Sequence, residues 1–329
     1  MIRHCLHSEI DRKKWDDAIA SYGNIYAYSW YLYVVHPGWE ALVEDDYQAV
    51  MPLTGRRKFG VKYLFQPYFT QQLGVFSKQL PTAEKVKVFL EAIPRDYRFV
   101  EIRLNESNTL EDSSKGIEYH RNVLLDLDQD YETIRSNYHT NTKRNLTKAE
   151  SNDLQLVDSV ASEHVIALFR DNRGASLSKW GDAEYKVLTQ LVNEAQEHDA
   201  AFLVGVTDKE MAELFCAAIF MKTDGRITFL FSGLSEEGKQ RHAMTFLLDR
   251  VIQRYINQPI TFDFEGSDDE NLARFYLGFG GKEVKYPSYY SNKLSGISNA
   301  VLKAWKRINT YIIEITDILY YLLKKNIFL

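Results

Sequence analysis

The feature that most constrains the fold is an alternation of apolar strands and amphipathic helices in the second half of the chain. Two helices are expected at 162–170 and 182–197. After them come segments that we predict as three strands, a helix, a strand, a helix and a strand: 201–207, 211–221, 226–231, 243–256, 260–264, 271–279 and 282–286. The first of these later helices has Phe246, Leu247, Val251 and Tyr255 on one face. This order predicts an α/β domain.

The first half repeats this order in outline. Strands are expected at 39–44 and 47–55, a helix capped by Thr82 at 82–93, and further strands at 99–104 and 120–127. A chain of 329 residues is long enough for two domains, and its 21 Tyr and 18 Phe favour extensive sheet. We therefore predict an N-terminal domain at 1–128, a C-terminal domain at 129–293 and a helical tail at 294–329.

Charge and cysteine content exclude several classes of protein. The formal net charge is −5, which argues against a dedicated DNA-binding protein. Cys5 and Cys216 are the only cysteines, so we expect neither a disulfide framework nor a zinc site, and a reducing cytoplasm is the simplest location. The N-terminus lacks the apolar run of a signal peptide, and no apolar stretch is long enough to span a membrane.

Two further segments can each be interpreted in two ways. The segment 131–150 is polar and basic, and we expect either a solvated connecting helix or a helix that contacts an anion near a substrate; its cations are Arg135, Lys143, Arg144 and Lys148. The tail carries a heptad pattern of apolar residues from Val301 to Leu322. This pattern predicts that the helix at 301–323 packs on its own domain or forms a homodimer. An interfacial membrane helix is the other reading, favoured by Lys324 and Lys325.

A polar loop at 235–242 is the first candidate site. It feeds the helix that begins at Ala243, and a helix N-terminus offers unpaired N–H groups and a positive dipole end to a pyrophosphate. The alternative is an ordinary loop with solvated charges. The candidate cofactor-binding residues here are Ser232, Gly233, Leu234, Gly238, Lys239, Gln240, Arg241, His242 and Ala243.

The strand at 260–264 and the helix after it complete the constellation. The strand leads into Asp263, Glu265 and Gly266, and the helix segment carries Asn271, Phe275-Tyr276 and Phe279-Gly280. This block resembles the C-terminal half of a GNAT acyltransferase domain, and more closely the Fem-type aminoacyltransferases, which have two such domains in tandem. Trp30, the segment 66–74 and the basic segment 131–150 extend the resemblance to about 290 residues. The loop departs from the usual GNAT loop, since it reads Gly238-Lys239-Gln240-Arg241-His242-Ala243.

The resemblance implies two tandem GNAT-like domains and an N-acyltransferase. It would transfer an acyl group from acyl-CoA, such as acetyl-CoA, to a small-molecule amine by direct attack, without a metal. The acceptor would be an amino sugar or a cell-envelope or polysaccharide precursor. The resemblance also adds Asn271 to the cofactor-binding residues, although Asn271 is equally a helix cap. Tyr276 stands where Fem-type proteins often have Lys, which favours a thioester over aminoacyl-tRNA.

Roles for three side chains follow from the chemistry of amide formation. The attacking amine must lose a proton, and Asp263 or Glu265 is placed to accept it, unless both only cap the next helix. Two acids so close can raise one pKa. Tyr276 is the candidate proton donor to the leaving thiolate, unless it is a core residue. A backbone N–H near Ser232-Gly233 is expected to polarise the thioester carbonyl.

Two other functions remain open. A Fem-type aminoacyl or peptidyl transferase would use charged tRNA, bound by the basic segment 131–150. A non-catalytic GNAT-fold protein would instead bind a partner and dimerise through its tail.

Overall fold

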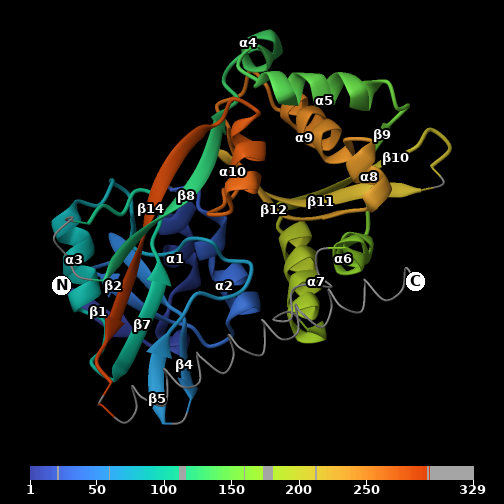
Figure 1. The fold of residues 1–329 in the computed structure, drawn as a ribbon. Coiled ribbons are helices and arrows are strands. Elements are labelled where there is room, and N and C mark those ends of the chain that lie inside the picture. The colour runs from blue at the N-terminus through green and yellow to red at the C-terminus, as the bar shows by residue number, and fades with distance from the viewer. Residues whose placement is uncertain are drawn as a thin grey trace.

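The computed structural model describes residues 1–294 and 296, apart from 21, 59, 111–115, 159, 173–180 and 212. These residues form two sheets (Figure 1). The smaller is antiparallel, in the order β1 (Ile2–Cys5), β2 (Glu40–Glu44), β3 (Ala49–Leu53) and β6 (Phe76–Ser77). The larger has the order β4 (Gly55–Lys58), β5 (Val61–Leu64), β7 (Tyr97–Arg103), β14 (Lys282–Asn292), β8 (Ile117–Asp126), β13 (Thr261–Asp263), β12 (Arg226–Leu234), β11 (Leu214–Thr223), β10 (Ala201–Thr207) and β9 (Gln155–Asp158).

The large sheet joins the two halves of the chain. The last strand, β14, lies between β7 and β8 and pairs antiparallel with both, so it is shared by the two proposed domains. Each half also contains one parallel pair, β5 with β7 and β12 with β13. A helix lies in each crossover, α3 (Ala83–Glu91) in the first and α9 (Ala243–Arg254) in the second. The predicted α/β class is confirmed, and the two halves repeat one motif.

Helices cover both faces of the strands in the second half. One face carries α5 (Thr140–Glu150), α9 and α10 (Glu270–Leu277); the other carries α6 (Ser162–Asp171) and α7 (Asp182–Glu197) (Figure 1). One core cluster joins α6 and α7 to the first half, where Trp15 of α1 (Arg12–Ala20) and Tyr31 of α2 (Ser29–Val35) are fully buried. The two halves therefore share a hydrophobic core as well as a sheet. No helix within the described ranges is long and apolar enough to cross a membrane.

Several predicted boundaries were wrong. The segment 131–150 is two helices, α4 (Tyr131–Ser136) and α5, because the backbone of His139 is extended. The loop after β12 contains α8 (Glu236–Gln240), whose first turn is capped by the Ser235 hydroxyl. Asp269, not Asn271, caps α10, so Asp263 and Glu265 do not cap it either. The heptad segment 301–323 lies outside the described residues.

Candidate active site

Two acids lie at the junction of the two halves. Asp263 ends β13 and is fully buried, and Glu265 follows two residues later. The chain turns sharply here, since Glu265 and Gly266 have φ values of 57° and 48°. A left-handed conformation is unfavourable for a non-glycine residue and persists only where its surroundings impose it. Here the Asp263 carboxylate accepts a hydrogen bond of 2.8 Å from the Glu265 backbone N–H.

An arginine and a second acid hold Asp263 in place. Arg226, at the start of β12, donates to Asp263 Oδ2 at 3.1 Å and also to Glu106. Burial alone would lower the pKa of Arg226, but the charges of Glu106 and Asp263 raise it, so it stays a cation. Burial raises the pKa of Asp263 above its usual value, and the Arg226 charge opposes this rise. The three side chains form a charge cluster between β12, β13 and the first half of the chain.

Glu265 is partly buried and contacts the first half of the chain directly. The Tyr26 hydroxyl, in the 3-10 helix η2 (Ile25–Ala27), donates to its carboxylate, and the Gln71 amide donates to its backbone carbonyl. Burial raises the pKa of Glu265 to about 8; the Tyr26 hydrogen bond opposes this rise and the Asp263 charge adds to it. A carboxylate with a pKa near neutrality is suited to accept a proton from an amine.

The turn at Gly266 can be tested by substitution. A Cβ at Gly266 would lie 2.4 Å from Asn122 Cα and 2.5 Å from the Arg121 carbonyl oxygen, both backbone atoms of β8. We expect Gly266→Ala to lower the free energy of unfolding by about 1–3 kcal/mol, because the positive φ and the clash both oppose a side chain. The matched control is Gly225→Ala, where a Cβ meets nothing within 4 Å. Equal denaturant midpoints for the two variants would contradict this account.

Tyr276 lies on the opposite face of β13 from the Asp263 side chain. Its ring stacks on Phe264 at 5.4 Å and meets the edge of Phe229 at 6.1 Å, and only 8% of the residue is exposed. Successive side chains of a strand point to opposite faces, so Phe264 faces α10 while Asp263 faces Arg226. The structure thus brings the two acids together but places Tyr276 on the opposite face of the sheet.

The predicted cations of the 235–242 segment are already paired within it. Lys239 forms an ion pair of 2.5 Å with Glu236, and Arg241 forms one of 2.7 Å with Glu237. Arg241 also lies over the ring of Phe215, 4.9 Å from its centroid. Both side chains are half-exposed. They contribute less free positive charge to an anion site than their sequence positions suggest.

The N-terminus of α9 instead receives its cations from α5. His242 precedes α9 with a φ of 58°, and its side chain does not cap the first N–H groups of the helix. Burial lowers the pKa of His242, and the nearby charges of Lys148 and Arg144 lower it further. Neither of those two cations has an ion pair with any residue that the structure describes. The basic helix α5 and the segment that leads into α9 were predicted separately, but α5 lies beside α9 (Figure 1), and the charges of Arg144 and Lys148 act on His242 at its N-terminus.

The other residues predicted to bind a cofactor have mixed positions. Gly233 faces α6, because a Cβ there would lie 2.6 Å from the Val165 carbonyl oxygen, and Gly238 packs against the Phe215 carbonyl in the same way. Asn271 is exposed on α10. Of the remaining residues, Ala243 is buried, Gln240 is exposed, and Ser232 and Leu234 have intermediate exposure. The two glycines are thus explained by close packing.

Strands β12 and β13 form a fork. They pair only at Arg226–Thr228 with Thr261–Asp263, and β12 then continues to Leu234. The β12–β11 register shifts there: Phe229 pairs with Phe220 and Phe231 with Ile219, so Leu230 is an extra residue in β12. A bulge of this kind bends the strand. Leu230 lies two residues beyond Thr228 on β12, as Glu265 lies two residues beyond its partner Asp263 on β13.

Sequence reasoning missed four residues of this site: Tyr26, Gln71 and Glu106 from the first half and Arg226 from the second. Gln71 lies in the segment 66–74 that extends the resemblance, but no pattern marked any of the four as a site residue. A charged residue at the start of an apolar strand, as at Arg226, was the single available signal. Within the described ranges, no group of three or more His, Cys, Asp or Glu side chains is arranged to hold a metal ion.

Comparison with known proteins identifies the fold. No family model and no curated protein matches the chain. Solved structures do match. A structure of FemX has a TM-score of 0.63 at 10% identity and covers 86% of this chain and 97% of its own. A tandem GNAT protein from the clavulanic acid biosynthesis pathway has a TM-score of 0.51 at 11% identity, covering 90% and 100%. The structure of L-PGS from Bacillus licheniformis has a TM-score of 0.50 at 13% identity, covering 89% and 95%.

Proposed function

On the premise that this chain has the tandem-GNAT fold, we propose that it is an N-acyltransferase that uses a coenzyme A thioester. The observation that carries the proposal is the spacing of two features along β12. Leu230 on β12 and Glu265 beyond β13 each lie two residues past the last paired residues, Thr228 and Asp263. Four residues at about 3.3 Å each place the end of β12, at Leu234, roughly 13 Å beyond Leu230, and α8 then leads from there to the N-terminus of α9. An extended donor bound by its phosphates at α9 would place its thioester beside Glu265.

The reaction needs one bond formed and one broken. The amine nitrogen attacks the thioester carbonyl carbon, its proton passes to the Glu265 carboxylate, and the carbon–sulfur bond then breaks. Backbone groups on the open edge of β12 would orient the donor and polarise its carbonyl. The thiolate must then gain a proton. We propose Tyr276 as the donor for that step: it lies on the other face of the sheet, and a thioester seated in the fork, where β12 and β13 no longer pair, would be open to both faces. Tyr276→Phe removes its hydroxyl while retaining the ring.

The test is release of coenzyme A thiol from acetyl-CoA and a longer acyl-CoA in the presence of a panel of amino sugars and amines. The proposal predicts thiol release that depends on the amine. Binding of thioester without turnover with any amine would favour a non-catalytic GNAT-fold protein.

Substitutions on α5 test the proposed place of the phosphates. We expect Arg144→Gln with Lys148→Gln to raise the KM for acyl-CoA about tenfold or more while kcat changes little, because the lost contacts are remote from the reacting atoms. Lys143→Gln is the matched control, since Lys143 lies on the same helix and donates to the Ser136 carbonyl at 2.7 Å. An unchanged KM in the double variant would remove α5 from the donor site.

A charged tRNA is the rival donor, and the basic surface of α5 favours it. An extended polyanion would contact Arg135 and Lys143 as well as Arg144 and Lys148. All four substitutions would then weaken binding by similar factors, and affinity would fall steeply with salt. If the ligand is instead the compact pyrophosphate of coenzyme A, only the Arg144 and Lys148 substitutions should weaken binding.

A further inference from the structure

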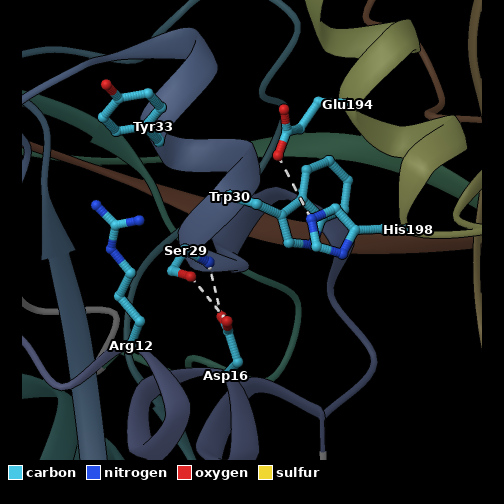
Figure 2. A pocket seen from close by; sticks show the side chains of 7 residues that line it. All are labelled: Arg12, Asp16, Ser29, Trp30, Tyr33, Glu194 and His198. Atoms are coloured by element: carbon cyan, nitrogen blue, oxygen red, sulfur yellow. Dashed lines mark hydrogen bonds and ion pairs between the residues drawn. The ribbon is translucent and has the colours of Figure 1, made fainter.

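A pocket of about 460 Å³ lies between helices from the two halves of the chain (Figure 2). None of the proposed site residues lines it. Its walls come from α1, α2 and α7, and its lining residues are Arg12, Asp16, Ser29, Trp30, Tyr33, Glu194 and His198. A volume of this size falls within the range of small-molecule sites.

The charges on α1 are held apart across this pocket. Arg12 and Asp16 are one helical turn apart, a spacing that usually permits an ion pair. Asp16 instead accepts hydrogen bonds of 2.7 Å from both the backbone N–H and the hydroxyl of Ser29. Arg12 points away from Asp16 and lies over the Tyr33 ring, 5.5 Å from its centroid (Figure 2). Arg12 has no ion pair with any part of the chain that the structure describes.

The opposite wall supplies a second carboxylate and an aromatic surface. Glu194 contacts His198 on the same helix at 3.4 Å, and both side chains are about half-exposed. The His198 ring stacks on Trp30 at 4.9 Å with an interplanar angle of 16°. The carboxylates of Asp16 and Glu194 thus approach the pocket from different helices beside the Trp30 side chain (Figure 2). Carboxylates and aromatic rings together are suited to bind an ammonium group.

We propose that this pocket binds a zwitterionic amino acid. The ligand carboxylate would pair with the Arg12 guanidinium, which offers a planar set of donors. The ligand ammonium group would lie between Asp16 and Glu194, whose carboxylates retain free acceptor positions. Such a ligand would bridge α1 and α2 to α7 and stabilise the junction of the two halves. This inference is independent of the proposed acyl transfer.

The test measures thermal unfolding and calorimetric binding of the full chain with each of the common L-amino acids. We expect at least one of them to bind and to raise the melting temperature by mass action. The amide of that amino acid, which lacks the carboxylate charge, and its N-acetyl derivative, which lacks the ammonium charge, should each bind about tenfold more weakly or worse. Absence of binding by every amino acid, or equal binding of the amide or the N-acetyl derivative, would overturn the proposal.

Substitutions place the ligand in this pocket. Arg12→Gln and Glu194→Gln should each weaken binding roughly tenfold or more, whereas Lys13→Gln should leave it unchanged. Lys13 is the matched control because it lies next to Arg12 on α1 and is exposed, with a surface ion pair to Asp17. Both test positions are at the surface of the pocket, so the variants are expected to fold, which their unliganded melting temperatures check. Wild-type affinity in the Arg12 variant would contradict the assignment.

Discussion

Replacing Glu265 with Gln is expected to lower the rate of acyl transfer by roughly 10²–10⁴-fold, the usual contribution of a general base. The amide retains the shape of the side chain and still accepts from Tyr26, so the loss would be chemical. Because the pKa of Glu265 is raised to about 8, wild-type activity should rise with pH through that value. The variant should lose this dependence.

Glu265→Gln is also expected to change the stability of the protein. Whereas activity should fall, stability at alkaline pH should be maintained or increased. An acid whose pKa is raised on folding stabilises the native state below its ordinary pKa of 4.5, and this contribution is lost as pH rises towards about 8. Glu265→Gln removes that loss. The variant should therefore be at least as stable as wild type above about pH 8 in denaturant titrations. Glu283→Gln is the control for both measurements, because Glu283 forms a half-exposed ion pair with Arg121.

If Glu265→Gln and Glu283→Gln transfer the acyl group at equal rates, Glu265 is not the base.

Arg226→Met is expected to produce the largest loss of stability. Arg226 is 17% exposed and lies between Glu106 and Asp263, whose side chains are 11% and 1% exposed. Removing the cation leaves two buried carboxylates without compensation, which typically costs about 3–5 kcal/mol. Asp263 would also lose the contact that fixes it beside Glu265.

Urea denaturation measures this effect. Lys222→Met is the matched control, because Lys222 lies on the adjacent strand with an exposed ion pair to Asp199 at 3.3 Å, worth at most about 1 kcal/mol. Adding Glu106→Gln to Arg226→Met should recover part of the loss, since one uncompensated charge is removed. If Arg226→Met costs no more than Lys222→Met, the cluster does not hold the junction together.

Periodicity was sufficient for most of the fold. The alternation of strands and helices predicted β10, α9 and β13 closely, because their apolar faces are continuous. It failed at β14, which was predicted to start at 282 but extends to Asn292, because pairing with two strands supports residues that no local pattern indicates. It also failed at His139, where an extended backbone conformation divides one polar segment into two helices.

The site was harder to predict because its partners are distant in sequence. Tyr26 and Glu265 are 239 positions apart, and Arg226 and Glu106 are 120 apart. No local spacing reports such contacts. Asp263 and Glu265 stood out because acids after an apolar strand are unusual. Lys239 and Arg241 also stood out, yet their ion pairs to Glu236 and Glu237 depend on α8, a helix that the polar sequence did not indicate.

Calorimetric titration of the purified chain with acetyl-CoA and a longer acyl-CoA tests the central claim most directly. A donor held by the α9 N-terminus, Arg144 and Lys148 predicts saturable binding, expected at micromolar concentration. Binding should weaken as salt rises, because its main contacts are ionic. Absence of binding by either thioester would contradict the acyl-CoA mechanism and direct the search for a donor to charged tRNA.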